Sequence, residues 1–138
     1  MSLTADRARA VIAAAETKAW EIGVPVVVAV LDAGVHLKAF ARMDGAPLAS
    51  IDIALKKART SALFRAPSEA VWEYCKPGAP APGLELTNGG LAPFGGGVPL
   101  EAGGELVGAV GVSGGAVAQD LEIAKAAAAA FHFEPERA

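Results

Sequence analysis

The feature that most constrains the fold is an apolar run over residues 24–31, V-P-V-V-V-A-V-L. Its β-branched residues favour a strand, and the lack of polar alternation predicts that both faces of this strand are covered. Pro25 interrupts the run and Asp32 closes it. Because a membrane span needs roughly 20 apolar residues, the run is too short to cross a bilayer, and we expect no membrane partner.

A second strand follows this run after a short turn. D-A-G at 32–34 is typical of a hairpin turn, and residues 35–42 alternate along the chain. Strands joined by so short a turn pair antiparallel. The alternation places Val35, Leu37, Ala39 and Ala41 on one face of the strand, and His36, Lys38, Phe40 and Arg42 on the other.

Helical spacing surrounds these strands. Residues 4–22 form one predicted helix, with Thr4 as N-cap and Gly23 as C-cap. Ser50 is positioned to cap a second helix that ends near residue 63. On this second helix, Ile51, Leu55, Ala58 and Ala62 are expected to face inward.

The second half of the chain adds a hairpin and two more helices. Pro67-Ser68-Glu69 opens a short helix that ends near Cys75, and a closing helix is predicted over residues 117–131. Between them, residues 98–100 and 105–112 form a hairpin around 102–104. The order of elements predicts an α/β (α+β) fold: one domain over residues 1–138, with an antiparallel sheet flanked by helices in a profilin-like sandwich.

Composition limits the partners of such a domain. Hydrophobic residues make up 53% of the 138 residues, and so small a domain cannot bury all of them. We therefore expect burial between subunits of a homo-oligomer. The net charge of −3, without a basic run that contains aromatics, argues against a nucleic-acid partner. A single cysteine and the absence of a signal-peptide core at the start predict a cytoplasmic protein.

Residues capable of chemistry are concentrated between positions 32 and 60. His36 and Arg42 share the polar face of the second strand, where His36 would transfer a proton or bind a metal and Arg42 would bind a carboxylate. An ordinary solvated strand face is the alternative. Asp52 and Arg59 share a face of the second helix, where an ion pair between Asp52 and the lysine four residues later needs no function.

Glycine-rich segments offer two further candidates. Asn88 and Gly89, in the N-G-G turn, would let a flat ligand approach the backbone, although a plain turn explains them equally well. G-A-V-G-V-S-G-G at 108–115 lies between a strand and a helix, as anion sites do, but matches no phosphate-binding motif. Close approach of another backbone or of another subunit is the preferred interpretation of these glycines.

Metal and triad chemistry find little support in the sequence. His36, His132 and Cys75 are the nitrogen and sulfur ligands that the chain offers, and their spacing matches no structural zinc site. His132 forms an H-x-E pair with Glu134 close to the chain end. No G-x-S-x-G motif is present. We therefore predict neither a bound metal nor a Ser-His-Asp triad.

An ordered set of sequence blocks runs through nearly the whole chain. The blocks are V-A-V-L-D-A-G-V-H-L (28–37), R-M-D-G-A (42–46), S-I-D-I-A-L-K-K-A-R-T (50–60), G-G-V-P-L (96–100) and the 108–115 segment, with Gln119-Asp120 following. Together they resemble the GlcG/HbpS-like family of haem-degrading-domain proteins. This resemblance implies an antiparallel sheet flanked by helices, assembled into dimers or octamers. Some members of the family bind haem, others are attached to corrinoid enzymes, and others belong to catabolic gene clusters.

Three functional hypotheses remain open. The first is a homo-oligomeric small-molecule-binding protein that takes haem or another flat anionic ligand, with Arg42 and Arg59 pairing its carboxylates. The second is a cofactor-independent lyase, isomerase or hydrolase that acts on a small carbonyl or carboxylate compound in a catabolic pathway, with His36 as acid or base. The third is an assembly protein without a ligand. The predicted ligand-binding residues are Arg42, Asp52, Arg59, Asn88 and Gly89.

Overall fold

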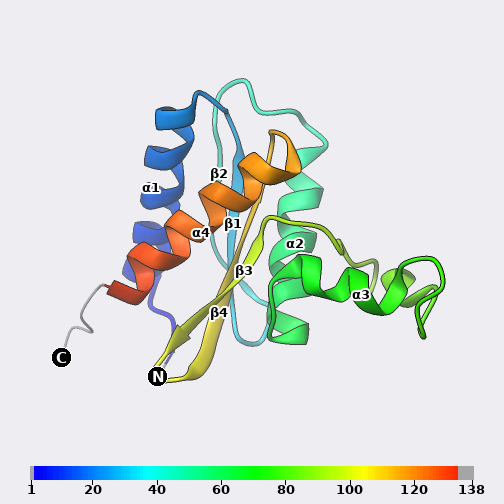
Figure 1. The fold of residues 1–138 in the computed structure, drawn as a ribbon. Helices are drawn as coiled ribbons and strands as arrows, with labels where there is room; N and C mark the ends of the chain where they lie inside the picture. Colours follow the sequence, from blue (N-terminus) through cyan, green and yellow to red (C-terminus); the bar gives the residue numbers. More distant parts are fainter. Residues whose placement is uncertain (1, 134–138) are drawn as a thin grey trace.

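An antiparallel sheet lies between helices on both faces of the computed structural model, which describes residues 2–133 (Figure 1). The strand order is β2-β1-β4-β3. This arrangement confirms the predicted α+β sandwich. The strands are β1 (Val27–Asp32), β2 (Leu37–Arg42), β3 (Gly97–Ala102) and β4 (Glu105–Ser113). The helices are α1 (Ala5–Ile22), α2 (Ser50–Phe64), α3 (Trp72–Cys75) and α4 (Val117–Phe133), with 3-10 turns η1 (Ser68–Val71) and η2 (Leu84–Leu86).

The central strand β1 is covered on both faces, as its apolar run predicted. Helices α1 and α4 pack against each other on one side of the sheet, and α2 covers the other side (Figure 1). Val28 and Val30 point into the core beneath α1 and α4, while Val27 and Ala29 pack toward Ala54 of α2. Successive side chains of β1 therefore point alternately into two separate cores.

The turn between β1 and β2 is longer than the alternating pattern predicted. Strand β2 begins at Leu37 instead of Val35, because Val35 adopts a left-handed φ of 61° within the turn. The carboxylate of Asp32 accepts hydrogen bonds from the backbone N–H groups of Gly34 (2.9 Å) and His36 (3.0 Å). These bonds satisfy the turn amides before the strand ladder starts.

Helix α2 begins without the predicted serine cap. Its N-cap is Ala49, which makes no side-chain capping bond, and Ser50 is the first helical residue. Ser50 is buried, and its hydroxyl accepts a 3.2 Å hydrogen bond from the hydroxyl of Ser113. The prediction was wrong because the Ser50 side chain binds the sheet below it instead of the first turn of the helix.

Glycine in β4 allows α2 to approach the sheet closely. A Cβ on Gly111 would lie 2.6 Å from the backbone nitrogen of Ala58 and closer still to the carbonyl oxygen of Ala54. Ala54 and Ala58 are fully buried, whereas Ile51 and Leu55 are only partly buried beside them. The preferred interpretation of the 108–115 glycines, close approach of another backbone, is therefore confirmed at Gly111.

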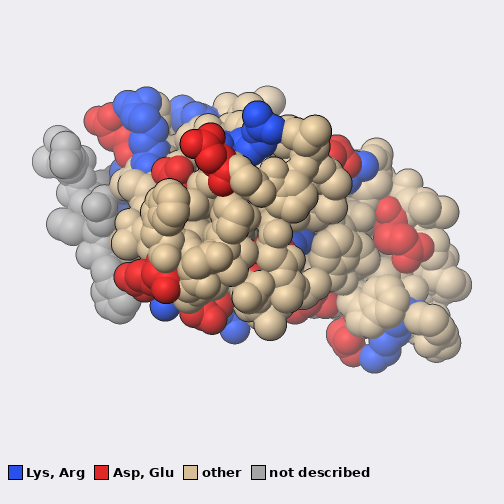
Figure 2. Space-filling view, turned by 90° about the horizontal axis from the view of Figure 1, so that it is seen from above, with Lys and Arg blue, Asp and Glu red and all other residues tan. Residues whose placement is uncertain are grey.

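Part of the apolar surplus lies on the surface of the protein. No helix within residues 2–133 has the length and hydropathy to span a bilayer. Viewed from above, a broad uncharged area occupies the middle of the molecule, with charged residues mainly around its rim (Figure 2). The exposed large hydrophobic side chains are Trp20, Leu37, Phe40, Leu48, Leu63, Trp72, Tyr74, Leu86, Phe94 and Val117.

Candidate functional site

The two predicted residues on the polar face of the second strand lie toward its opposite ends. His36 precedes β2, with 80% of its side chain exposed. Arg42 is the last residue of β2 and is exposed opposite Val27 of β1. Since a strand rises by about 3.3 Å per residue, the two lie roughly 20 Å apart along it. Within residues 2–133, no hydrogen bond or ion pair joins them.

Asp32 orients the His36 side chain. The Nδ1 atom of His36 lies 3.3 Å from Oδ1 of Asp32. Partial burial acts to raise the pKa of Asp32, but the N–H groups of His36 and Gly34 and the His36 imidazole outweigh it, so this pKa is lowered from 3.8. A hollow of about 370 Å³ opens beside the pair and is also lined by Lys38 and Leu106. An oriented imidazole thus stands at the rim of a ligand-sized hollow.

The predicted residues of α2 meet the N-G-G turn. Nη1 of Arg59 donates a 3.0 Å hydrogen bond to the carbonyl oxygen of Asn88, and Gly89 follows beside it. Asp52 pairs with Lys56 at 3.2 Å, one helical turn along α2. The structure therefore brings Arg59, Asn88 and Gly89 together, whereas Asp52 lies about two helical turns before Arg59 on α2. Their role in binding a ligand stays a prediction.

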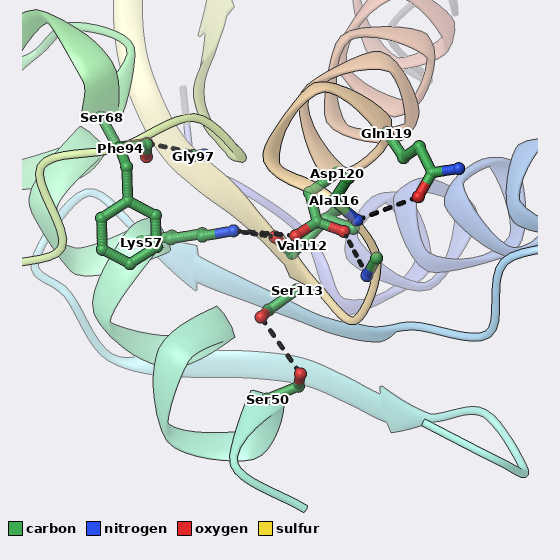
Figure 3. Close-up of polar contacts among 11 residues, drawn as sticks. Ser50, Lys57, Ser68, Phe94, Gly97, Val112, Ser113, Ala116, Gln119 and Asp120 are labelled. Carbon is green, nitrogen blue, oxygen red and sulfur yellow. Dashed lines mark hydrogen bonds and ion pairs between the residues drawn. The ribbon is translucent and has the colours of Figure 1, made fainter. Parts of the chain in front are cut away.

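An interior ionic cluster was missed by the sequence analysis. The side chain of Lys57 is 1% exposed, and its Nζ donates hydrogen bonds to the carbonyl oxygen of Val112 (2.9 Å) and to Oδ2 of Asp120 (3.1 Å), as Figure 3 shows. The same Nζ lies 5.1 Å from the centroid of the Phe94 ring. Burial lowers the pKa of Lys57, and the Asp120 carboxylate opposes this shift.

The carboxylate of Asp120 lies beside the glycine-rich segment 108–115, where the sequence suggested an anion site. Its Oδ1 accepts a 2.9 Å hydrogen bond from the backbone N–H of Gly115. Gln119 Oε1 accepts a second bond from the N–H of Ala116, also at 2.9 Å (Figure 3). A carboxylate is favoured at a helix N-terminus because the free amides and the helix dipole stabilise negative charge. The chain therefore supplies its own anion at the start of α4.

One signal in the sequence could have located Lys57. It lies three residues after Ala54 and four before Ser61, on the stripe of α2 that is buried. A lysine on a buried stripe requires a partner, since an isolated buried charge is strongly disfavoured. The sequence could not identify that partner, because Asp120 is 63 residues further along the chain.

A second hollow lies beside Phe94. Its volume is about 540 Å³. Ser68 anchors the neighbouring loop: its hydroxyl donates to the carbonyl oxygen of Phe94 at 2.6 Å and accepts from the N–H of Gly97 at 2.9 Å. The hollow is lined by Glu69, Trp72, Glu73, Pro93, Phe94, Gly95 and Val117.

Metal-ligating side chains do not gather in the described part of the chain. No group of three or more His, Cys, Asp or Glu side chains between residues 2 and 133 is arranged to hold a metal ion. His132 Nε2 accepts a 3.1 Å hydrogen bond from the N–H of Glu101. Its H-x-E partner Glu134 lies outside the described residues.

The fold and these clusters define a class of protein: a small α+β domain whose four-stranded antiparallel sheet carries one helix on one face and two on the other. The family model described as "Haem degrading protein HbpS-like" matches residues 3–129. The chain therefore belongs to the HbpS-like family, which confirms the resemblance.

Relatives and solved structures cover nearly all of this chain. An uncharacterised 15.0 kDa protein from the dhaT-dhaS intergenic region of Citrobacter freundii is 42% identical over 131 residues, which are 94% of this chain and 92% of the relative. The corrinoid adenosyltransferase PduO of the same organism is 38% identical over 133 residues, which are 96% of this chain but 40% of PduO. A solved PduOC:heme complex superimposes with a TM-score of 0.90 at 37% identity, over 94% of this chain and 95% of that chain.

Proposed function

We propose that this protein is a homo-oligomeric small-molecule-binding protein of the HbpS-like type, whose ligand is haem or another flat anionic compound. The observation that carries the proposal is the exposed surface of β2. Leu37 and Phe40 are exposed there beside His36, Lys38 and Arg42. Haem has flat apolar faces, an iron that accepts imidazole and two carboxylates, so this strand offers a partner for each part. The PduOC:heme complex supports the same ligand class.

The geometry of His36 suits an iron ligand. Histidines that bind metals usually direct the second ring nitrogen toward a carboxylate, which holds the ring in position. The Nδ1 of His36 lies 3.3 Å from the Asp32 carboxylate, which leaves Nε2 to face a ligand. Lys38 and Arg42 follow along the strand as partners for carboxylates. Bound haem would supply the iron chemistry, while these residues hold and orient it.

A second copy of the chain is the proposed cover for β2. This strand pairs only with β1 among the described strands, so its outer edge presents backbone groups together with exposed Leu37 and Phe40. Open strand edges that carry apolar residues favour pairing with another chain. We place Asp52, Arg59, Asn88 and Gly89 of the neighbouring copy on the opposite wall, within a dimer or octamer in the cytoplasm.

Titration with haemin tests this function. We expect a saturable Soret shift, which His36→Ala abolishes and Arg42→Ala or Arg59→Ala weakens about tenfold. His132→Ala is the matched control, because it removes the other histidine of the chain and should leave the spectrum unchanged. Light scattering on the same samples would show an oligomer. A Soret response that does not saturate, or one unaffected by His36→Ala, would overturn the proposal.

The Asp32–His36 pair also favours a second function. A carboxylate that orients an imidazole beside a hollow is an arrangement suited to general acid–base catalysis. We infer as the alternative a cofactor-independent lyase, isomerase or hydrolase that acts on a small carbonyl or carboxylate compound in a catabolic pathway. Intermediates of the surrounding gene cluster are the substrates to test. Equal turnover by the wild type and by His36→Ala would remove this function.

A further inference from the structure

The hollow beside Phe94 has the form of a separate binding site. Its volume of about 540 Å³ lies within the usual range for small-molecule pockets. Two aromatic side chains form its walls, and they remain 44% exposed at Trp72 and 40% exposed at Phe94. The Ser68 hydrogen bonds anchor the Phe94 backbone to η1, so the walls are held in place without a ligand.

A buried carboxylate oxygen in this hollow lacks a partner. Oε2 of Glu69 is inaccessible to solvent, and no donor within residues 2–133 bonds to it. A carboxylate oxygen is costly to bury without a donor, so the negative charge of Glu69 would be stabilised by a cation bound in the hollow. Gly95 packs closely beside this oxygen: a Cβ there would lie 3.4 Å from it and 3.1 Å from Cγ1 of Val117.

The charges around the hollow determine which ligand it would accept. Its lining contains two carboxylates, Glu69 and Glu73, and no Lys, Arg or His. The buried cation Lys57 lies 5.1 Å from the centroid of the Phe94 ring and is already bonded to Asp120. Glu73 is paired with Lys76 at 2.7 Å, which leaves Glu69 as the unpaired acid. Aromatic faces attract organic cations and repel anions.

We propose that this hollow binds a small organic cation with an apolar body. An ammonium group would pair with the negative charge of the Glu69 carboxylate, while the hydrocarbon part would lie between Trp72 and Phe94. The site is independent of the proposed haem function, because it shares no lining residue with the proposed haem site and selects the opposite charge. Its success or failure therefore leaves the haemin titration unaffected.

Calorimetric titration with benzylammonium tests the site, with benzyl alcohol as the neutral analogue. We expect saturable binding of benzylammonium and at least tenfold weaker binding of benzyl alcohol. Benzyltrimethylammonium keeps the positive charge but has no N–H donor, so it should bind with an intermediate affinity. Equal affinities for the charged and neutral probes, or no saturable heat with benzylammonium, would overturn the proposal.

Variants assign the binding to particular residues. Glu69→Gln should weaken benzylammonium binding about tenfold, because it removes the negative charge that pairs with the ammonium group. Glu73→Gln is the matched control: it removes the carboxylate that Lys76 already neutralises and should change affinity less than twofold. Thermal melts would show that each variant is folded. If Trp72→Ala lowered the oligomer mass in light scattering, a second copy would occupy the hollow and the proposal would fail.

Discussion

The interior cluster around Lys57 and the surface of β2 contain the same kinds of side chain in opposite situations. Lys57 and Asp120 are buried, bonded to each other and bonded to backbone groups. His36 and Arg42 are exposed on an edge strand, and within residues 2–133 only His36 has a charged partner. The difference indicates that the interior pair holds the fold together, whereas the strand surface is available to other molecules.

Lys56 and Lys57 show this contrast within two consecutive residues. The side chain of Lys56 is 36% exposed and pairs with Asp52 on the same helix, whereas that of Lys57 is 1% exposed and pairs with Asp120 of α4. A helix turns by 100° per residue, so neighbours in sequence face different surroundings. Substituting each lysine in turn is therefore the most direct test of the comparison.

Removal of Lys57 should have the largest effect on stability. Lys57→Ala would leave the Asp120 carboxylate buried without its cation, and breaking a buried pair in this way costs about 3–5 kcal/mol. Urea unfolding followed by circular dichroism would measure the loss. A decrease below about 1 kcal/mol would contradict the view that this pair holds α2, β4 and α4 together.

A paired substitution separates the charge from the packing. Lys57→Met with Asp120→Leu removes both charges while keeping apolar volume, and such replacements of buried ion pairs are often neutral or stabilising. We expect the double variant to recover most of the stability that Lys57→Ala loses. If it is no more stable than Lys57→Ala, the hydrogen bonds to Val112 and Gly115 matter more than the ion pair.

Gly111→Ala should have the next largest effect. The added methyl group would meet the backbone of α2 at Ala54 and Ala58, and backbone cannot move aside as a flexible side chain can. Overpacking of this kind costs typically about 1–3 kcal/mol. Thermal unfolding would measure it. An unchanged Tm would show that α2 is loosely seated on the sheet.

Local chemistry made most of the fold predictable from the sequence. The apolar run identified β1, and Thr4 and Gly23 identified both ends of α1. Failures occurred where a side chain served a distant element: Ser50 bonds to Ser113, 63 residues away, instead of capping its own helix. Residue propensity and spacing describe only neighbours along the chain. They could therefore not predict the contacts that form when α2 packs on β4.

The candidate site was predictable only in part for the same reason. The i,i+7 spacing placed Asp52 and Arg59 on one face of α2, but the contact of Arg59 with Asn88 depends on a turn 29 residues later. The hollow beside Phe94 was missed entirely. Its walls come from η1, α3, the 93–95 loop and α4, and no local motif links these segments.

Asp32→Asn should destabilise the fold at the turn between β1 and β2 by a smaller, pH-dependent amount. The pKa of Asp32 is lowered in the fold, so its stabilisation is present above 3.8 and is lost as the pH falls through the lower folded value. We expect a loss of about 1–2 kcal/mol near neutral pH, since hydrogen bonds to a charged acceptor are involved. Urea unfolding from neutral pH downward should show the wild type and the variant converging in acid. A constant gap would contradict the assigned cause.

Lys56→Ala should have the smallest effect, and it completes the comparison with Lys57. Its pair with Asp52 is an exposed i,i+4 contact, which contributes about 0.3–0.5 kcal/mol and is screened by salt. The loss should therefore be about tenfold smaller than that of Lys57→Ala, and it should disappear in about 1 M NaCl, where screening is strong. Lys56→Ala could instead destabilise the protein as much as Lys57→Ala in urea unfolding. The exposure of a charged side chain would then not tell whether it stabilises the fold or is free to bind a ligand. Assigning the β2 surface to ligand binding would lose its physical basis.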